Sequence, residues 1–300
     1  MKVAVIGCGT VGSSWALVFA RAGHEVAIYD KAVSAAEAAA GQVADNDGRA
    51  AGRVTVVADL AAALSGADYI QESAPERLAI KRELYQTLDG LIGENAVIGS
   101  STSGLPASSF TETLSCRGRC LVAHPINPPH LIPLVELVPA PWTASGTLDF
   151  VRRLMEQVGQ KPITLAREIN GFVVNRLQSA LLAEAFRLVQ DGVCPAHDVD
   201  RAVADGLGLR WSFLGPFATI DLNAANGIAE YCANLGPMYY GLAKEQADPR
   251  EWDAGLVGEI EEKMRAAVPE ATLPARRAWR DRFLGSIVEA KKEIEKALGA

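Results

Sequence analysis

The sequence lacks the patterns that mark several large classes of protein. It contains no C-x-x-C pair, and its five cysteines are scattered at Cys8, Cys116, Cys120, Cys194 and Cys232. Such spacing predicts neither a disulfide framework nor a zinc site, so we expect no metal. Scattered thiols also favour a location in the reducing cytoplasm.

Basic residues are in the minority. The chain has 29 lysines and arginines against 36 aspartates and glutamates, which gives a net charge of −7. Domains that bind a phosphate backbone usually present a basic face. Nucleic acid is therefore not an expected partner.

Long apolar runs are absent as well. Residues 2–6 imitate the charged and apolar parts of a signal peptide, but glycines at positions 7, 9 and 12 interrupt the run. No stretch reaches the roughly 18 uninterrupted apolar residues of a spanning helix. We therefore predict neither a signal peptide nor a membrane segment.

The sequence does contain short β-branched runs that alternate with longer helical patterns. Its 300 residues, 49% of them hydrophobic, suffice for two domains. We expect strands at 2–7, 25–30, 54–57, 69–72, 96–100, 119–123, 134–138 and 161–165. This order predicts an α/β fold with a Rossmann-type doubly wound sheet over residues 1–166. From Glu168–Gln190 onward the patterns are helical, which predicts an all-helical C-terminal domain over residues 167–300.

Local signals place some helix ends. Asp59 is expected to cap a helix over residues 60–64, and Gly159 is expected to be left-handed after a helix that ends near Val158. Alternating charges at helical spacing over residues 286–298 predict a solvated terminal helix.

A glycine motif follows the first predicted strand and opens a helix, which is the context that dinucleotide binding requires. Gly7 permits the tight turn, Gly9 lets the backbone approach a pyrophosphate, and Gly12 lets helix and strand pack closely. Free N–H groups at the helix start face the anion. The alternative is a plain strand-to-helix connection. The residues that we expect to bind the cofactor here are Gly7, Gly9, Thr10, Val11 and Gly12.

Asp30 ends the second predicted strand, 18 residues after Gly12. A carboxylate in this place accepts hydrogen bonds from the adenosine ribose and repels a 2′-phosphate, so it predicts NAD rather than NADP. Lys31 next to it weakens that repulsion. The alternative interpretation of Asp30 is a turn residue.

His124 follows a predicted strand at the carboxyl edge of the sheet, where doubly wound folds bind ligands. Oxidation of an alcohol needs a base at the hydroxyl, and imidazole titrates in the right range. Glu136 lies 12 residues on, in the next predicted strand, so the chain can double back and let the carboxylate orient the imidazole. A structural hydrogen-bonding role is the alternative for both residues. His24 and His197 are expected to be exposed loop residues.

Besides the glycine loop, three stretches have the order and spacing of a known family: Ser100-Ser101-Thr102-Ser103-Gly104, Ala123-His124-Pro125-Ile126-Asn127-Pro128 and Asn170-Gly171-Phe172-Val173-Val174-Asn175-Arg176. With them, the chain resembles the 3-hydroxyacyl-CoA dehydrogenase superfamily over nearly its full length. The resemblance implies that His124 is the general base and Glu136 its orienting partner. It implies that Ser103 and Asn175 hydrogen-bond the reacting oxygen of the substrate. A homodimer formed by the helical domain is also implied.

The same resemblance places Glu76 and Lys81 near the cofactor ribose. Without it, both look like helix-surface charges, and Ser103 looks like a turn or a helix cap. Asn175 falls inside a long apolar helix, where a buried amide needs a partner. That position favours a site or a packing role.

Several other segments resemble the branch that contains L-gulonate 3-dehydrogenase, also called lambda-crystallin: Pro133–Pro139, Asp205–Arg210, Gly215-Pro216 and Arg276–Asp281. Ser101 stands where acyl-CoA enzymes typically have asparagine. The region between Asp30 and Val54 is also shorter than the helical excursion with which those enzymes hold CoA. Both departures argue against a CoA ester.

Carnitine dehydrogenase is a neighbouring branch, since its relatives share Gln71-Glu72-Ser73. A quaternary ammonium favours aromatic faces, whereas gulonate needs hydrogen-bond donors and a cation. Arg210 or Arg280 would clamp the carboxylate that both substrates carry. The aromatic residues that would form a cage are Trp211, Phe213, Tyr231, Tyr239 and Tyr240.

Together, these features predict NAD-dependent oxidation of the 3-hydroxyl of a short L-3-hydroxy acid, with L-gulonate first. The alternatives are L-carnitine, a 3-hydroxyacyl-CoA such as 3-hydroxybutyryl-CoA, and an NAD-binding crystallin-like protein without turnover. We expect a small-molecule site between the domains of a cytoplasmic homodimer.

Overall fold

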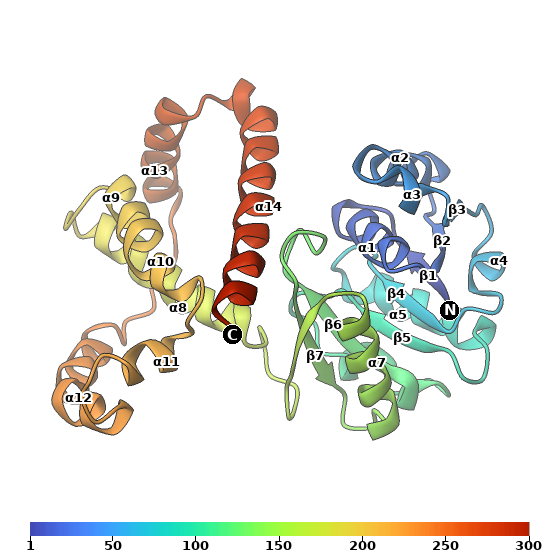
Figure 1. The fold of residues 1–300 in the computed structure, drawn as a ribbon, viewed down its shortest axis with the longest axis horizontal. Coiled ribbons are helices and arrows are strands. Elements are labelled where there is room, and N and C mark those ends of the chain that lie inside the picture. The colour runs from blue at the N-terminus through green and yellow to red at the C-terminus, as the bar shows by residue number, and fades with distance from the viewer. Residues whose placement is uncertain (300) are drawn as a thin grey trace. The chain divides into compact units, whose positions relative to one another are not determined.

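The computed structural model describes residues 1–299, which form two compact units (Figure 1). Unit 1 comprises Met1–Arg176, and unit 2 begins at Leu177. The boundary at residue 166 that we drew from the sequence lies upstream of this division and stays a prediction.

Unit 1 is built on an eight-stranded sheet within the described residues. The strands are β1 (Lys2–Ile6), β2 (Glu25–Tyr29), β3 (Val54–Val56), β4 (Tyr69–Glu72), β5 (Val97–Ser100), β6 (Cys120–Pro125), β7 (Leu134–Pro139) and β8 (Lys161–Thr164). All eight predicted strands are confirmed to within two residues. Their spatial order is β3-β2-β1-β4-β5-β6-β7-β8, and only the β6–β7 pair is antiparallel in this sheet. The first six strands therefore have the doubly wound order that the sequence predicted.

Side chains that alternate along the strands fill two cores. Val3 and Val5 pack on one face of the sheet, and Ala4 and Ile6 on the other. The first face is covered by α1 (Thr10–Arg21), α2 (Val33–Asn46), α3 (Gly48–Ala51) and α7 (Ser145–Gln157). The second is covered by α4 (Leu60–Leu64), α5 (Leu78–Leu91) and α6 (Ser108–Thr111), and a short 3₁₀ turn spans Arg117–Arg119. The carboxyl ends of β1–β6 thus share one edge of a well-packed sheet.

Two local predictions are confirmed. The Asp59 side chain accepts a hydrogen bond from the Ala62 N–H at 2.8 Å and so caps α4. Gly159, at φ +83°, ends the α7 turn in the left-handed region.

The helix expected from Glu168 begins later than predicted. The structure has α8 at Val174–Gln190, because Gly171 (φ +74°) and Phe172 (φ +50°) are both left-handed and a right-handed helix cannot pass through them. Asn175 therefore lies in the first turn of α8 rather than well inside a helix, and it is half-buried rather than buried.

Unit 2 is helical. After α8 it contains α9 (Ala196–Arg201), a π-helical turn (Ala202–Leu207), α10 (Gly208–Trp211), α11 (Pro216–Asp221), α12 (Ile228–Glu245), α13 (Ala254–Ala267), a 3₁₀ turn (Glu270–Thr272) and α14 (Leu273–Leu298). The terminal helix is thus longer than the predicted 286–298. Among the described residues, no helix has the length and apolarity needed to span a membrane.

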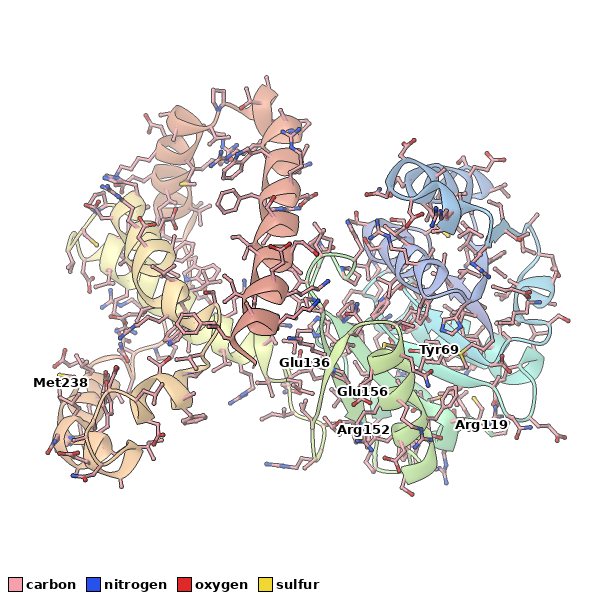
Figure 2. The ribbon with its side chains drawn as sticks, viewed as in Figure 1. Tyr69, Arg119, Glu136, Arg152, Glu156 and Met238 are labelled. Carbon is pink, nitrogen blue, oxygen red and sulfur yellow. The ribbon has the colours of Figure 1, made fainter. Side chains whose placement is uncertain are left out.

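Unit 2 buries little of its apolar surface. Within residues 177–299 only Thr219 and Leu256 are buried. Met238 of α12 is one of many large apolar side chains left exposed (Figure 2). Both hydrophobic core clusters of the described residues lie in unit 1.

Candidate active site

The glycine loop, residues 7–12, has the shape of a phosphate cradle. Gly7 is left-handed at φ +93°, and a Cβ there would lie 2.6 Å from the Ser73 carbonyl oxygen. A Cβ at Gly12 would lie 1.8 Å from the Gly7 oxygen, whereas one at Gly9 would meet no protein atom within 4 Å. The surrounding backbone thus leaves no room for a side chain at positions 7 and 12, whereas the space beside Gly9 is open. Contact of Gly9 with a pyrophosphate stays a prediction. Thr10 and Val11 form the first turn of α1, as dinucleotide binding requires.

Asp30 lies directly after β2 and ties this strand to the glycine loop. Its Oδ2 accepts a hydrogen bond from the Cys8 N–H at 2.8 Å, and its Oδ1 accepts one from the Ala32 N–H at 2.9 Å. The carboxylate is thereby fixed at the edge of the sheet, where an adenosine ribose binds in Rossmann folds. Burial, with a contribution from the charge of Asp30, raises the pKa of Cys8 to about 12, so this thiol is not a nucleophile.

His124 and Glu136 face each other across the antiparallel β6–β7 pair. His124 Nδ1 lies 2.7 Å from Glu136 Oε2, and both side chains are buried. The doubling back of the chain that we predicted from the 12-residue spacing is confirmed. Because Nδ1 is engaged, Nε2 is the nitrogen left to take a proton from an alcohol. We call this pair the dyad.

The second oxygen of Glu136 holds the start of α8. Oε1 accepts hydrogen bonds from the Val173 N–H at 2.8 Å and the Val174 N–H at 3.0 Å. Burial by itself would raise the pKa of Glu136, but the hydrogen bonds from His124, Val174 and Val173 together hold that pKa below its ordinary value. The carboxylate stays ionised and oriented.

Phe172 shields the dyad. Its side chain is fully buried, and its ring centroid lies 5.6 Å from that of His124 at an interplanar angle of 53°. The imidazole is therefore packed on one side by an aromatic ring rather than by water.

Ser103 and Asn175 are brought together by a direct contact. Asn175 Nδ2 donates a hydrogen bond to the Ser103 carbonyl oxygen at 2.7 Å. Ser103 belongs to the loop that follows β5, residues 101–105, which we call the Ser103 loop. The contact joins this loop to the first turn of α8, two segments that are distant in sequence.

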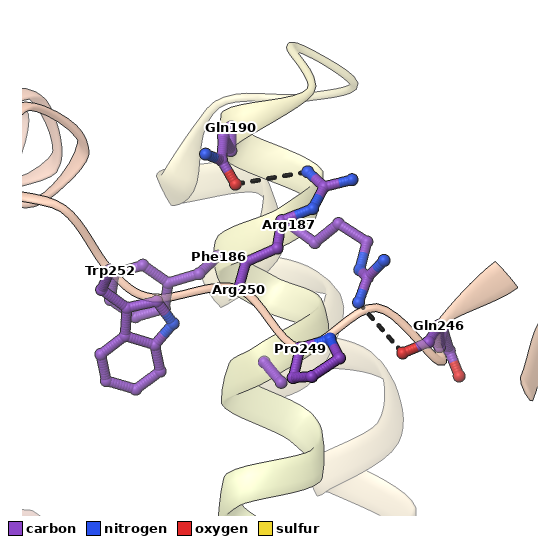
Figure 3. A pocket seen from close by; sticks show the side chains of 8 residues that line it. Phe186, Arg187, Gln190, Gln246, Pro249, Arg250 and Trp252 are labelled. Atoms are coloured by element: carbon purple, nitrogen blue, oxygen red, sulfur yellow. Dashed lines mark hydrogen bonds between the residues drawn. The ribbon is translucent and has the colours of Figure 1, made fainter.

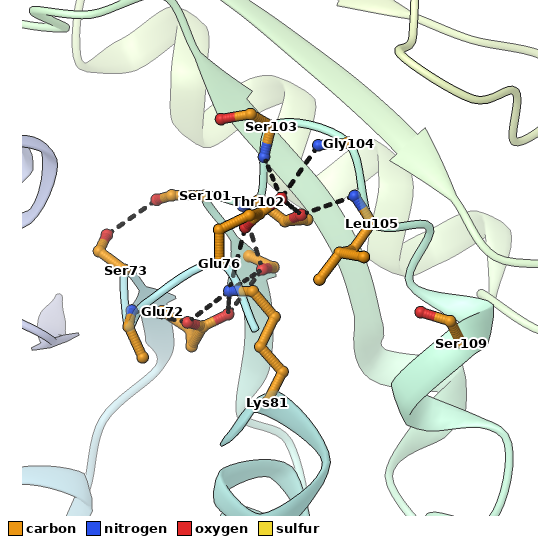
Figure 4. A network of polar contacts seen from close by, with 12 residues as sticks. Glu72, Ser73, Glu76, Lys81, Ser101, Thr102, Ser103, Gly104, Leu105 and Ser109 are labelled. Carbon is orange, nitrogen blue, oxygen red and sulfur yellow. Dashed lines mark hydrogen bonds and ion pairs between the residues drawn. The ribbon is translucent and has the colours of Figure 1, made fainter. Parts of the chain in front are cut away.

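Lys81 of α5 is fully buried, so its interpretation as a helix-surface charge is wrong. Its Nζ lies 2.9 Å from each carboxylate oxygen of Glu72 and 3.4 Å from Ser100 Oγ (Figure 4). Ser100 Oγ in turn donates to Glu72 Oε2 at 2.6 Å. Glu72 could not be identified as a site residue from the sequence, because a single glutamate at a strand end has no pattern that predicts burial.

Glu76 supports the Ser103 loop. Its Oε1 accepts hydrogen bonds from Thr102 Oγ1 at 2.5 Å, the Ser103 N–H at 3.0 Å and the Gly104 N–H at 3.1 Å (Figure 4). Its Oε2 lies 3.9 Å from Lys81 Nζ. The Ser103 N–H and C=O are thus both held, by Glu76 and Asn175. Contact of Glu76 and Lys81 with the cofactor ribose stays a prediction.

The other histidines differ from the dyad. His197 is exposed, as predicted. His24 is half-buried, with its Nε2 buried and without a hydrogen bond in the described chain, so its predicted exposure is wrong. Its ring is packed near Phe19, and burial lowers its pKa. In the fourth histidine, His130, Nδ1 lies 3.0 Å from Ser14 Oγ of α1.

Arg210 and Arg280 belong to unit 2. Both are exposed, and Arg280 forms an ion pair with the adjacent Asp281 at 2.7 Å. Of the proposed cage residues, Tyr231 and Tyr239 lie with their hydroxyl oxygens 2.9 Å apart. Contact of these arginines with a substrate stays a prediction.

Unit 2 also contains a small cavity of about 160 Å³ (Figure 3). Phe186 stacks on Trp252 there with ring centroids 4.0 Å apart. Arg187 donates to backbone carbonyls at the end of α12, and Arg250 pairs with Asp191. These bonds tie α8 to the segment after α12. None of the predicted site residues lines this cavity.

Comparison with known proteins gives a consistent result. Residues 2–169 match the model of the 3-hydroxyacyl-CoA dehydrogenase NAD-binding domain, and residues 171–264 match that of its C-terminal domain. The chain is 38% identical to the lambda-crystallin homolog of Bos taurus, over 97% of this chain and 96% of that protein. It is also 38% identical to the L-carnitine dehydrogenase of Streptomyces griseus subsp. griseus, over 86% of this chain and 81% of that protein.

A solved structure is similar over the whole chain. It is that of 5-formyl-3-hydroxy-2-methylpyridine 4-carboxylic acid 5-dehydrogenase, described as an NAD⁺-dependent dismutase. The TM-score is 0.82 at 30% identity, covering 98% of each chain.

Proposed function

Because the chain belongs to the 3-hydroxyacyl-CoA dehydrogenase family and is an NAD-dependent dehydrogenase of hydroxyl groups, we propose that it oxidises the 3-hydroxyl of a short L-3-hydroxy acid. L-gulonate is the first candidate substrate and 3-dehydro-L-gulonate its product. The observation that carries this proposal is the buried dyad beside the contact between Ser103 and Asn175.

In this proposal each side chain has one task. Bound NAD supplies the hydride acceptor. The glycine loop holds its pyrophosphate, and Asp30 holds its adenosine ribose. His124 Nε2 removes the hydroxyl proton as the carbonyl forms. Glu136 stabilises the resulting imidazolium, and Ser103 and Asn175 hydrogen-bond the reacting oxygen.

The choice of a free acid over a CoA ester is supported by Ser101. Its Oγ accepts a hydrogen bond from Gln71 Nε2 at 2.8 Å and lies 2.8 Å from Ser73 Oγ, so the hydroxyl is engaged within the protein. An asparagine, typical of the acyl-CoA enzymes, would not fit these contacts unchanged. The identity with a lambda-crystallin homolog favours gulonate, and the identity with an L-carnitine dehydrogenase keeps carnitine as the alternative.

A substrate panel tests the proposal. We expect NADH absorbance to rise when L-gulonate and NAD are supplied. The kcat/KM for L-gulonate should be at least tenfold above those for L-carnitine, L-3-hydroxybutyrate and 3-hydroxybutyryl-CoA. With L-gulonate as substrate, the kcat/KM for NAD should be at least tenfold above that for NADP. A higher kcat/KM with carnitine or the CoA ester would replace gulonate by that substrate. NADH binding without turnover of any hydroxy acid would contradict the proposal.

We also propose that two copies associate through unit 2. The exposed apolar side chains of α14 are spaced by four or seven residues and therefore lie on one helix face. They are Trp279, Phe283, Ile287, Ile294 and Leu298. Monomers rarely leave so much apolar surface uncovered. The dimer and the cytoplasmic location both stay predictions from the sequence.

Light scattering during gel filtration tests the association. We expect the wild-type chain to elute with twice its own mass. The double substitution Phe283→Asp and Ile287→Asp should weaken dimerisation by more than about tenfold, since each side chain contributes roughly 1.5–3 kcal/mol when buried. Leu91→Asp, at an exposed position in unit 1, is the matched control and should leave the dimer intact. A monomeric wild-type protein would refute the proposal.

A further inference from the structure

A chain of buried polar side chains lies beside the glycine loop, and the proposed reaction does not use it. Tyr69 and Gln71 are neighbours on β4 and are fully buried. Tyr69 Oη lies 2.7 Å from Gln71 Oε1, and Gln71 Nε2 lies 2.8 Å from Ser101 Oγ. Ser101 Oγ lies 2.8 Å from Ser73 Oγ (Figure 4). These hydrogen-bonded side chains thus connect the core of unit 1 to Ser73, a partly exposed serine directly after β4.

The first two hydrogen bonds of this chain have a fixed direction. Gly99 makes room for the phenol, because a Cβ there would lie 2.0 Å from Tyr69 Oη. Burial raises the pKa of Tyr69 far above its ordinary value, so the hydroxyl keeps its proton and donates to Gln71 Oε1. Gln71 Nε2 also lies 3.4 Å from the Ala123 carbonyl oxygen, which only an N–H can face. Gln71 is therefore the donor to Ser101.

The third hydrogen bond follows from the first two. Ser101 Oγ has accepted one hydrogen bond and still carries a proton of its own. In the part of the chain that the structure describes, the remaining partner of Ser101 Oγ is Ser73 Oγ. Either hydroxyl could donate across this contact, but a Ser73 proton directed at Ser101 would leave the Ser101 proton without an acceptor in the described part of the chain. We therefore infer that Ser101 donates to Ser73 and that the proton of Ser73 points away from the core.

Ser73 lies where a dinucleotide passes. Its N–H donates to the Ile6 carbonyl oxygen at 2.7 Å, and its Cβ would lie 3.4 Å from a Cβ placed on Gly12. The strand order reverses between β1 and β4, and dinucleotides bind across such a crevice. Because Asp30 marks the adenosine side at β2, the β4 side is that of the nicotinamide half.

We propose that the Ser73 hydroxyl donates a hydrogen bond to the nicotinamide half of bound NAD, and that Tyr69, Gln71 and Ser101 fix its direction. A directed donor loses less rotational freedom on binding than a freely rotating hydroxyl does. The inference concerns cofactor binding alone and does not depend on which hydroxy acid is the substrate.

Binding titrations test the proposal without any turnover. The Kd for NADH, measured by fluorescence, should rise about 2- to 12-fold in Ser73→Ala, the loss expected for one neutral hydrogen bond. The Kd for AMP, measured by calorimetry, should not change, since AMP lacks the nicotinamide half. Ser109→Ala is the matched control, because its hydroxyl donates to the Pro106 carbonyl outside the glycine loop. Its NADH affinity should equal that of the wild type.

The double variant Ser73→Ala/Ser101→Ala tests the direction of the chain. Its NADH affinity should be no lower than that of Ser73→Ala alone, because Ser101 acts only through Ser73. An unchanged NADH affinity in Ser73→Ala would overturn the proposal. So would an equal loss for AMP, which would place the contact elsewhere, or an NADH affinity of the double variant clearly below that of Ser73→Ala. Melting temperatures close to that of the wild type establish that each variant is folded.

Discussion

His124→Gln is expected to lower kcat by about 10²- to 10⁴-fold, the usual size of a lost general base. A glutamine side chain has no group that takes a proton from an alcohol, but its amide still donates a hydrogen bond to Glu136. Initial rates of NADH formation at saturating substrate measure the effect. The NADH Kd should stay within about twofold of the wild-type value, because His124 is not part of the glycine loop.

His197→Gln is the matched control for this experiment. His197 is exposed, its ring lies 3.3 Å from the neighbouring Asp198, and it belongs to unit 2. We expect wild-type kcat for this variant. If His124→Gln retained more than about a third of wild-type turnover, the alcohol proton would have to leave by another route and the dyad would lose its assigned role.

Most features of unit 1 that depend on residues close together in the sequence could be predicted. Strands were recognisable from β-branched runs, and the glycine loop from a motif whose spacing is dictated by close contacts between backbones. The pairing of His124 with Glu136 was also within reach, because a 12-residue return between two strands leaves few registers. In each case the residues that form the feature lie close together in the sequence.

Features that depend on tertiary contacts were not predictable in this way. Lys81 has the sequence context of a surface helix, and only the position of Glu72 on the adjacent strand explains its burial. The left-handed Phe172 could not be foreseen, because a bulky residue rarely adopts this conformation. This conformation is retained because burial of Phe172 and the hydrogen bonds that the Val173 and Val174 N–H groups donate to Glu136 compensate for the strain. Because of this turn, α8 begins at Val174 rather than at Glu168, and Asn175 lies in its first turn in contact with Ser103.

Glu136 connects His124 to the start of α8, since one carboxylate oxygen contacts His124 Nδ1 and the other accepts hydrogen bonds from the Val173 and Val174 N–H groups. Glu136→Gln is therefore expected to lower kcat by up to about 10⁴-fold, as in other sites where an amide enforces the wrong imidazole tautomer. The two backbone N–H groups retain the carbonyl oxygen of the glutamine, so its NH₂ group must face His124 Nδ1. An imidazole that accepts at Nδ1 carries its proton on Nε2 and cannot act as the base.

The same substitution should change how stability depends on pH. The pKa of Glu136 is lowered from its ordinary value of 4.5 in the folded protein, so its ionised form stabilises the fold above pH 4.5. That contribution is lost as the pH falls through the lower, folded-state pKa. Melting temperatures measured from pH 7 to pH 3 should therefore decline less steeply in Glu136→Gln than in the wild type.

Glu156→Gln provides the control, because Glu156 is exposed on α7 while Glu136 is buried in the sheet (Figure 2). This variant should keep wild-type kcat and the wild-type decline in acid. Because the orientation of the glutamine at position 136 depends on the two amides at the start of α8, full activity in Glu136→Gln would mean that these amides do not control the tautomer. The left-handed turn at Phe172 would then serve packing alone, and the connection between α8 and the dyad would have no part in catalysis.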